Sequence, residues 1–548
     1  MYLRASRQRR RDGSALVHLQ LAESYWDKSA KKSRTRVIQN VGRAEDEATI
    51  ERLKRLVKSI QRHVDPDALA ATEGQLRILD VREYGALYVL EELWRRLRIP
   101  EAVARALDGR RLELPVERAL FAMVANRCCA PASKLYCWEQ WLAEDALIEG
   151  ADGLALHHLY RAMDVLEEAK DDIEREVYFS VASLLRLDVE LVFYDTTSLH
   201  FEVDEPDADD DSGPGLRKRG FSKNGRGDAP QVVIGLAVTR DGFPVRHWVF
   251  PGNTVDVTTV SQVRRDLAGW KLSRCVFVGD AGMVSEANLR ELARGGGRYI
   301  VCVPVHKGGD IDKDVLARQG RYRTVAENLR VKEVVVGDGE RRRRYAVCHN
   351  PIEERRQRQH RDGVLAELEA ELARLKPEED GHSKRGCKLR ASRRYGRYLR
   401  TDRSGRLCIS RTKVREAERM DGKFVVTTND DTLTAEDMAL GYKQLQRAEQ
   451  AWRRMKSGLQ MRPVFHRLEH RIRAHIALNV LALLLERVAE HACGDTWRNI
   501  HDDLRQIKAV ALSGPDGEVL QTTEPSAAAQ KRLAALDIKP PKLVLQVG

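Results

Sequence analysis

The sequence predicts an α/β protein of several domains, in which a helical region precedes a unit of strands and helices that is interrupted by an insertion. Three observations support this prediction. Apolar residues recur at three- and four-residue intervals from about residue 47 to 185. Short apolar runs typical of strands follow as far as residue 303, and another begins at Phe424 after a basic stretch. With 548 residues, the chain is long enough for about two to four domains.

Charge and cysteine usage limit the class of protein. The chain has 94 Lys and Arg residues against 82 Asp and Glu residues, a formal charge of +12, which favours a polyanionic partner. Its nine Cys residues contain no C-x-x-C pair, so we expect reduced thiols in the core of a cytosolic protein. The basic N-terminus has no apolar signal segment, and the apolar run 476–485 is too short to cross a bilayer.

The N-terminal residues 1 to about 43 predict a basic β-hairpin. Its strands flank a turn at Lys28–Lys32 and carry many Lys and Arg residues. Such an arm either follows DNA phosphates or only solubilises the terminus. The alternation that predicts the strands runs through Val17, Leu19, Leu21, Val37, Ile38 and Val41.

The next region, to about Leu185, predicts a helical domain. Its apolar spacing gives four helices, and Pro100 and Pro115 separate the first two. The paired His157 and His158 are more typical of a structural role than of a ligand site. The predicted helices are Gly85–Leu97, Val116–Cys128, Leu154–Leu166 and Ile173–Leu185.

A small α/β unit follows, with the order strand, strand, strand, helix, strand, helix, strand. Acids stand where two of its strands stop: Asp195 after the first and Asp280 after the fourth. Ser285 is a good N-cap for the second helix. The elements are Val189–Tyr194, Gln231–Val238, Val245–Phe250, Val257–Leu267, Cys275–Gly279, Ser285–Arg294 and Tyr299–Val303.

Residues 310 to 423 predict a basic insertion into that unit. A hairpin around 337–339 and a Leu-rich helix from Leu365 to Leu375 come first. Ten bases against one acid then occupy Lys384–Arg406, with Tyr395 and Tyr398 among them. Bases interleaved with aromatic residues favour a nucleic-acid surface over a merely solvated run.

After the strand at Phe424–Thr428, a helix that opens at Thr434 or Glu436 continues through Gly441–Lys456. In a continuous helix, Tyr442, Glu449 and Lys456 would share one face, because a seven-residue step drifts by only about 20°. A second helix begins at Pro463, carries an apolar stripe to Leu484 and should pack on the sheet. The tail predicts short strands at Ile507–Leu512 and Leu543–Val547, separated by a loop.

Three carboxylates on these elements suit a metal-dependent phosphoryl transfer. Asp195, Asp280 and Glu449 can converge if the strand ends lie beside the helix. Carboxylates are preferred by hard ions such as Mg²⁺, with Mn²⁺ as a substitute, and two ions about 4 Å apart can serve both the attacking and the leaving oxygen. We therefore expect these three residues to be both the catalytic and the metal-binding residues.

The motifs around these acids resemble those of DDE transposases of bacterial insertion sequences, in the group with a Tyr-x2-Arg-x3-Glu-x6-Lys signature. Tyr442, Glu449 and Lys456 fall at its spacing, whereas Leu445 stands at the Arg position, for which Arg447 or Arg453 is a candidate substitute. Two further motifs of the family match around the other two acids, Tyr194–Thr197 around Asp195 and Val278–Gly282 around Asp280. A third, Phe250–Asp256, lies between them in the sequence.

The resemblance implies an RNase H-like catalytic core interrupted by a mixed α/β insertion and preceded by a helical domain with an N-terminal β-hairpin. It also implies double-stranded DNA as partner, both the terminal inverted repeats of the element and the target, a homodimer in the synaptic complex, and a bacterial, cytoplasmic, nucleoid-associated protein. The expected segments are a β-hairpin arm and helix (1–75), a helical domain that binds the DNA ends (76–186), the core (187–309 and 424–490), the basic insertion (310–423) and a tail (491–548).

DNA contacts are expected beside the acids and on the insertion. Tyr442 and Lys456 would contact phosphates or bases, and Trp452 either stacks on a base or is buried. The predicted DNA-binding residues are Tyr442, Lys456, Arg453, Trp452, Arg447, Lys384, Arg393 and Arg397.

Two other functions remain open at this point. His466, Glu469 and His470 match the H-x-x-E-H pattern of inverted zinc peptidases, but no third ligand follows. Alternatively, the chain is a DNA-binding protein that descends from a transposase and no longer uses its acids. Zinc content separates the first alternative from a transposase, and cleavage assays with Mg²⁺ separate the second.

Overall fold

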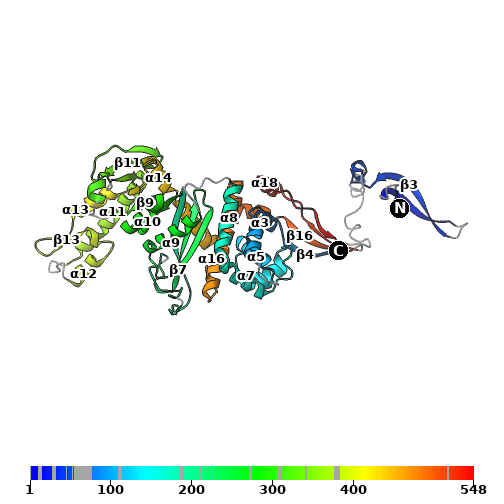
Figure 1. Cartoon of the computed structure of the whole chain (residues 1–548), viewed down its shortest axis with the longest axis horizontal. Coiled ribbons are helices and arrows are strands. Elements are labelled where there is room, and N and C mark those ends of the chain that lie inside the picture. Colours follow the sequence, from blue (N-terminus) through cyan, green and yellow to red (C-terminus); the bar gives the residue numbers. More distant parts are fainter. Residues whose placement is uncertain are drawn as a thin grey trace. The chain divides into compact units, whose positions relative to one another are not determined.

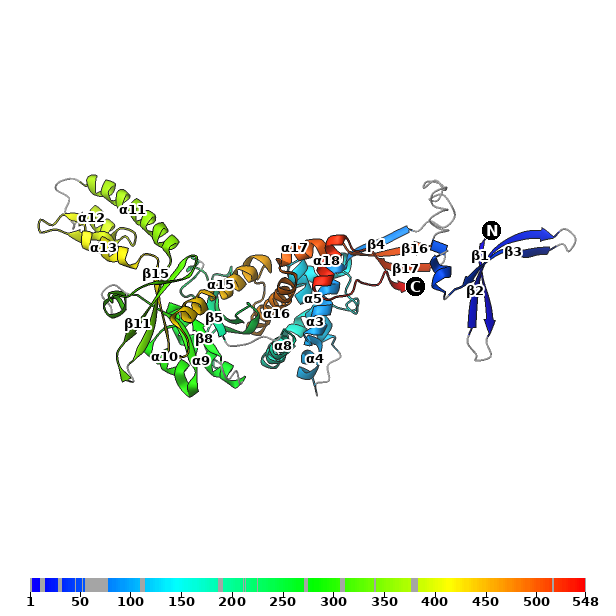
Figure 2. The same ribbon diagram turned by 90° about the horizontal axis from the view of Figure 1, so that it is seen from above.

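The computed structural model describes two compact units, shown in Figures 1 and 2. One comprises Met1–Asp80, Val510–Gln521 and Val544–Gly548, and the other comprises Val81–Ala509 and Thr522–Leu543. Within them the described residues are 2–9, 15–27, 32–44, 46–51, 53–54, 77–108, 114–185, 191–209, 211, 213–223, 225–270, 275–305, 311–339, 342–375, 383–514 and 517–547.

The N-terminal arm is a three-stranded antiparallel sheet in the order β1-β2-β3, formed by β1 (Tyr2–Arg9), β2 (Ala15–Asp27) and β3 (Lys32–Arg43). The predicted hairpin of β2 and β3 is confirmed, and β1 adds a strand by pairing along the first part of β2. Residues 28–31 of the predicted turn lie outside the described residues.

A second, four-stranded sheet has the order β18-β17-β16-β4. Its β16 and β18 confirm the two strands predicted in the tail. The predicted loop between them was wrong, because it contains β17 and a helix, α18, which starts where the Ser526 side chain accepts a hydrogen bond from the Ala529 N–H. The elements are β4 (Arg77–Glu83), β16 (Lys508–Gly514), β17 (Gly517–Thr522), α18 (Ala527–Ala535) and β18 (Val544–Val547).

The helical region confirms its four predicted helices as α3, α5, α7 and α8. α5 is buried on nearly every side because α3, α7 and α16 pack around it. The elements are α3 (Gly85–Arg96), α4 (Ile99–Ala106), α5 (Val116–Cys129), α6 (Lys134–Tyr136), η1 (Cys137–Asp145), α7 (Leu156–Glu168), α8 (Lys170–Leu184), α16 (Glu469–Cys493) and α17 (Trp497–Leu504).

A nine-stranded sheet has the order β10-β11-β12-β15-β9-β8-β5-β6-β7. The pairs of β5 with β8 and of β8 with β9 are parallel, and the other pairs are antiparallel. The predicted order of the small α/β unit is confirmed by β5 (Leu191–His200), β6 (Gln231–Thr239), β7 (Pro244–Pro251), α9 (Asp256–Gly269), β8 (Val276–Gly279), α10 (Glu286–Ala293) and β9 (Arg298–Val303).

The first part of the predicted insertion belongs to this sheet, which corrects its interpretation as a separate segment. β12 pairs with β15, and β11 and β10 extend the sheet beyond it, because this hairpin is apolar enough to be buried against its neighbours. These strands are β10 (Arg323–Ala326), β11 (Leu329–Val336), β12 (Arg343–His349) and β15 (Lys423–Thr428).

The rest of the insertion forms its own small core around Val364, Leu368, Tyr398 and Leu399. Its helices lie together at one end of the nine-stranded sheet (Figure 1). The elements are α11 (Pro351–Ala373), α12 (Lys384–Ala391), η6 (Gly396–Tyr398), β13 (Leu399–Thr401), β14 (Leu407–Ile409) and α13 (Arg411–Met420).

Two predicted helices differ from those observed. The helix through Gly441–Lys456 opens at Thr434, as predicted, but consists of α14 (Ala435–Lys443), α15 (Gln446–Arg453) and the π-helical turn η7 (Arg454–Gly458). The long helix begins at Glu469 instead of Pro463. It packs mainly on α5 and α7 and also contacts β7, because apolar residues cover nearly all of its surface and not one stripe.

The sheet separates two hydrophobic cores. Phe193 and Leu199 of β5 face the core that α14, α15 and α16 share with the helical region. Val192 and Tyr194 face the core formed with α9 and α10. Figure 2 shows α15 on one side of the strands and α9 and α10 on the other.

The state of the cysteines agrees with the prediction from their spacing. All nine cysteines are free, as expected, although Cys387 is exposed and the others are buried or partly buried. Among the described residues, no helix is long and apolar enough to cross a membrane.

Candidate active site

The sheet brings the first two acids to neighbouring strands. In the parallel pair of β5 and β8, Phe193 lies opposite Val278, so the same register two residues further on places Asp195 beside Asp280. The prediction that β5 ends before Asp195 was wrong. β5 continues to His200 because its second half pairs with β6 as far as Gln231, which places Asp195 inside the strand.

Asp195 lies on the face of the sheet that α15 covers. Side chains alternate along a strand, so Asp195 and Thr197 share the face of Phe193. α15, which carries Glu449, packs on β5 and β6 on that side. The three predicted acids therefore lie on the same part of the sheet: Asp195 within β5, Asp280 directly after β8 and Glu449 on the covering helix α15.

The acids interact electrostatically. Asp195 is partly buried, whereas Asp280 and Glu449 are exposed. The pKa of Asp195 is raised to about 6, chiefly by burial and also by the negative charges of Asp280 and Glu449. The Lys223 ammonium and the Thr196 N–H, which donates to Asp195 Oδ1 at 2.8 Å, oppose this rise.

The helix half of the site touches both strands through side chains. The Tyr442 hydroxyl donates to Asp280 Oδ1 at 2.9 Å. Lys456 Nζ donates to Thr197 Oγ1 at 2.5 Å. Burial lowers the pKa of Lys456 to about 8, and the neighbouring Arg462 guanidinium acts in the same direction. Tyr442, Glu449 and Lys456 thus meet at one site although the helix is broken between them.

A buried ion pair joins this segment to the helical region. Arg454 donates from Nε and Nη2 to the two carboxylate oxygens of Glu486, each at 2.6 Å. Glu486 lies in α16 and is fully buried. Because Arg454 begins η7, the pair fixes the backbone just before Lys456.

Three residues near the site were missed. Lys223 Nζ pairs with Asp256 Oδ2 at 2.8 Å and donates to the Thr196 carbonyl oxygen at 2.9 Å. Arg462 donates to His200 Nδ1 at 3.4 Å, beside Lys456. Lys223 and Arg462 lie in irregular connections, where apolar periodicity carries no signal. Asp256 is the last residue of the Phe250–Asp256 motif, and that motif could have indicated it from the sequence.

The predicted DNA-binding residues beside the acids have different environments. Trp452 is only 5% exposed and packs in the core, so the prediction of a base-stacking role is corrected to a core residue. Leu445, at the signature's Arg position, is also buried. Arg447 and Arg453 are exposed. The cations that reach the acids or their neighbours are Lys223 and Lys456, not these arginines.

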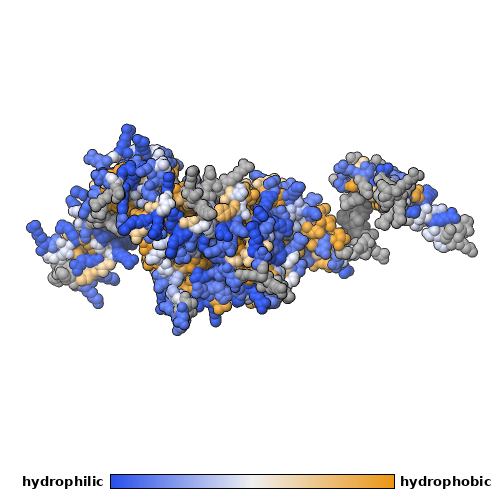
Figure 3. All heavy atoms as spheres, viewed as in Figure 1, coloured by the Kyte–Doolittle hydropathy of each residue, from blue (hydrophilic) through white to orange (hydrophobic). Residues whose placement is uncertain are grey.

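On the insertion, Lys384, Arg393 and Arg397 are all exposed, and the region of α11 to α13 is mostly hydrophilic on the face in Figure 3. One of the interleaved tyrosines, Tyr398, is not accessible to a base, which corrects that part of the interpretation. Tyr398 is buried in the insertion core, and the Tyr395 hydroxyl donates to Glu367.

The chemistry of the acids fits a hard divalent cation. Carboxylate oxygens are the ligands that Mg²⁺ and Mn²⁺ prefer, and mutual repulsion of these carboxylates would be relieved by such an ion. Within the described parts of the chain, no group of three or more His, Cys, Asp or Glu residues is gathered closely enough to hold a metal as it stands. Binding would therefore require the exposed side chains of Asp280 and Glu449 to close on Asp195.

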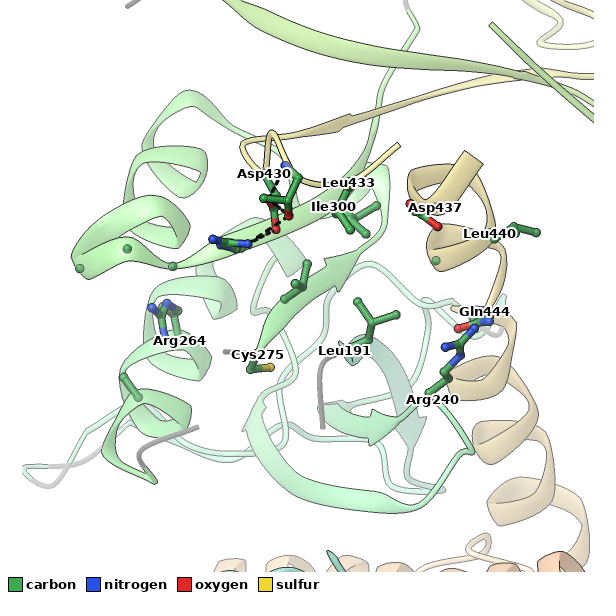
Figure 4. Close-up of a pocket in the computed structure, with 18 residues that line it drawn as sticks. Leu191, Arg240, Arg264, Cys275, Ile300, Asp430, Leu433, Asp437, Leu440 and Gln444 are labelled. Atoms are coloured by element: carbon green, nitrogen blue, oxygen red, sulfur yellow. Dashed lines mark hydrogen bonds and ion pairs between the residues drawn. The ribbon is translucent and has the colours of Figure 1, made fainter. Parts of the chain in front are cut away.

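A cavity of about 780 Å³ lies where the parallel strands β5, β8 and β9 begin (Figure 4). It is lined by the first residues of parallel strands, among them Leu191 and Val276, and by Leu440 of α14. Arg298 and Asp430 form an ion pair at its wall. Because the acids lie further along these strands, this cavity is not the site of the carboxylates.

The H-x-x-E-H residues do not form a metal site in the described structure. His470 pairs with Asp164 at 3.2 Å, and Glu469 pairs with Arg473 at 2.7 Å. His466 packs against the rings of Tyr160 and His475. Each side chain is engaged by a different partner, which removes the basis for the zinc peptidase alternative.

Two family models match the chain. Residues 207–485 match the family model described as "Transposase DDE domain", and residues 3–72 match "IS1634 family transposase, N-terminal domain". No curated protein matches the chain. A solved piggyBac transposase synaptic complex with hairpin DNA is 8% identical, with 83% of this chain and 79% of that chain covered and a TM-score of 0.34.

Proposed function

We propose that Asp195, Asp280 and Glu449 are the three catalytic acids of this chain, which belongs to the family of DDE transposases. Family membership implies cleavage and transfer of DNA strands, and the N-terminal match indicates a transposase of the IS1634 type. The signature group with Tyr442, Glu449 and Lys456 is part of the proposal.

The observation that carries this proposal is the convergence of the acids. Asp195 and Asp280 are neighbours by strand register, and the charge of Glu449 is close enough to act on Asp195. Tyr442, two turns from Glu449, donates directly to Asp280. Residues far apart in the sequence meet at one place only if this fold forms, so the convergence is independent of the motif match.

Each residue has a proposed role. Two Mg²⁺ ions, or Mn²⁺ in their place, would activate the attacking hydroxyl and stabilise the leaving oxygen when bound by the three carboxylates. Tyr442 orients Asp280 through its hydrogen bond. Lys456, whose ammonium lies at Thr197, neutralises a phosphate next to the scissile bond.

The wider DNA contacts are part of the same proposal. Lys384, Arg393 and Arg397 of the insertion would bind phosphates, because all three are exposed and cations on a surface attract the DNA backbone. Arg447 and Arg453 would contact DNA beside α15, where both are exposed. The helical domain would bind the terminal inverted repeats, and two copies of the chain would form the synaptic complex. Target DNA would bind after the ends of the element.

The test is cleavage of DNA that carries the ends of the element, in Mg²⁺ or Mn²⁺, by wild type, Asp280→Ala and Glu449→Gln. We expect each variant to lose cleavage by about 100-fold or more while binding the same DNA. Glu436→Gln, which removes an exposed acid of α14, is the matched control and should cleave normally.

Unchanged cleavage by Glu449→Gln would overturn the assignment of the third acid. If the wild type binds these ends but cuts them with neither metal, the chain is instead a DNA-binding protein in which the acids no longer act. Zinc content provides a further check, since a zinc peptidase would retain about one ion per chain.

A further inference from the structure

Phe221 is the most exposed large apolar side chain among the described residues, with 88% of its surface accessible. It lies in the connection between β5 and β6, two residues before Lys223. A single exposed apolar residue on a surface is common. Its significance depends on whether its backbone is fixed and on what lies beside it.

The backbone around Phe221 is fixed at three points. The fully buried Gln231 donates from Nε2 to the carbonyl oxygen of Phe221 at 3.0 Å. The Lys223 N–H donates to Ser198 Oγ at 3.0 Å. A Cβ added to Gly220 would lie 2.2 Å from the carbonyl oxygen of Gly252, so this backbone packs directly on the turn after β7.

This segment borders the proposed active site. Ser198 lies on β5, three residues after Asp195. The Lys223 side chain continues along the strand to the carbonyl oxygen of Thr196, and its ammonium lowers the pKa of Asp195. A fixed backbone therefore holds an exposed aromatic residue two positions before Lys223, whose charge acts on Asp195.

We propose that Phe221 stacks on an unpaired base of the DNA strand whose phosphate lies at Asp195, Asp280 and Glu449; this inference rests on the proposed function. Lys223, Lys456 and Arg462 supply positive charge beside the acids, which suits the phosphates of that strand. An aromatic ring cannot bind a phosphate but does stack on the face of any base. Phe221 thus provides the base stacking that the sequence suggested for Trp452, which is buried.

The experiment measures binding and photo-crosslinking without divalent ions, so that the DNA stays intact. The probe is a duplex that carries the end of the element, with 5-iododeoxyuridine at positions on either side of the cleavage site. Wild type, Phe221→Ala and Phe221→Tyr are compared. Leu543→Ala is the control, because Leu543 is an exposed apolar residue of the C-terminal tail, to which no DNA contact is assigned.

We expect one probe position to crosslink to Phe221 in the wild type. Phe221→Ala should lose this crosslink and bind the probe on the order of tenfold more weakly, whereas Phe221→Tyr should keep both properties. Leu543→Ala should behave as wild type. Thermal unfolding of Phe221→Ala should match wild type, because little of the removed ring is buried.

Equal affinity and unchanged crosslinks in Phe221→Ala would overturn the inference. Weakened self-association with unchanged DNA binding would also overturn it, since the ring would then contact a second copy of the chain. Because the assay needs neither metal nor cleavage, its outcome is separate from the test of the three acids. A wild type that crosslinks at Phe221 but never cleaves would preserve this inference while the proposed function fails.

Discussion

The two halves of the carboxylate site are built differently. Asp195 and Asp280 lie on or directly after paired strands, so backbone hydrogen bonds of the sheet fix their separation. Glu449 lies on the short helix α15, between a break at Leu445 and the π-helical turn η7. The strand half is positioned by main chain, and the helix half by side chains.

This difference determines which substitutions away from the acids should matter. Strand positions tolerate side-chain changes as long as the ladder remains. The helix half depends on three contacts that side chains make: Arg454 with Glu486, Tyr442 with Asp280, and Lys456 with Thr197. Removing these contacts one at a time should have the largest effect for Arg454, an intermediate effect for Tyr442 and the smallest effect for Lys456.

The largest effect is expected from Arg454→Met. The substitution leaves the fully buried Glu486 without its partner, which typically costs about 3 kcal/mol or more of unfolding free energy. Chemical unfolding at pH 8 measures the loss, because burial raises the pKa of Glu486 to about 7 even beside Arg454, so the wild-type ion pair is fully charged only above that pH. Cleavage should fall with it, because η7 loses its attachment to α16.

Two further variants make this prediction specific. Combining Arg454→Met with Glu486→Leu should restore part of the stability, because an apolar pair replaces an unpaired buried charge. Arg505→Met removes an ion pair with Asp502 in which both side chains are more than half exposed, and should cost at most about 1 kcal/mol. If Arg454→Met is as stable as Arg505→Met, the helix half is not held by this pair.

How much of the fold the sequence could predict depends on how far apart the interacting residues lie along the chain. The order of elements from β5 to β9 and the four main helices follow from local periodicity, and the acids follow from motifs on those elements. The extension of β5 through Thr196 to His200 depends on pairing with β6, some thirty residues away, which no local pattern contains. The pairing of β12 with β15 is invisible for the same reason.

Side-chain positions at the site were less predictable than the strands. Trp452 is in a strongly basic segment, yet α15 turns it into the core, where it packs with Ala448 and Ala451. Lys223 comes from an irregular connection and reaches the acids only through the folded path of that segment. The sequence therefore predicted the three acids and Lys456, but not Lys223 or Arg462.

An intermediate effect is expected from Tyr442→Phe. The variant loses the hydrogen bond to Asp280, while its ring can keep its packing against Phe424, 5.4 Å away between centroids. Cleavage should fall about tenfold, because one hydrogen bond to a charged group contributes about 1.5 kcal/mol, and the unfolding temperature should change little. The measurement is single-turnover cleavage of pre-bound DNA.

Tyr395→Phe is the control for the lost hydroxyl, because Tyr395 donates to Glu367 in the insertion. It should cleave at the wild-type rate. Equal loss of cleavage in both variants would mean that the insertion contributes to the chemistry as much as the contact between Tyr442 and Asp280, and the comparison of the two halves would fail.

The smallest effect is expected from the charge of Lys456, the residue that reaches from the helix half to Thr197 of the strand half. Burial and the neighbouring Arg462 lower its pKa to about 8, so its ammonium is lost as the pH rises from 7 to 9. DNA affinity should fall several-fold over this interval, by about one phosphate contact. Lys456→Arg should remove that dependence, because a guanidinium stays charged.

Unfolding cannot produce the same loss, because the sign of the linkage is opposite. The pKa of Lys456 is about 8 in the folded chain and about 10.4 for an unfolded lysine. Between these values the unfolded state binds more protons, so this residue makes the fold more stable as the pH rises. Affinity that falls while stability rises therefore isolates the ammonium at the phosphate. An identical pH profile in Lys456→Arg would assign the titration to another group and leave the helix half without a charge-dependent contact.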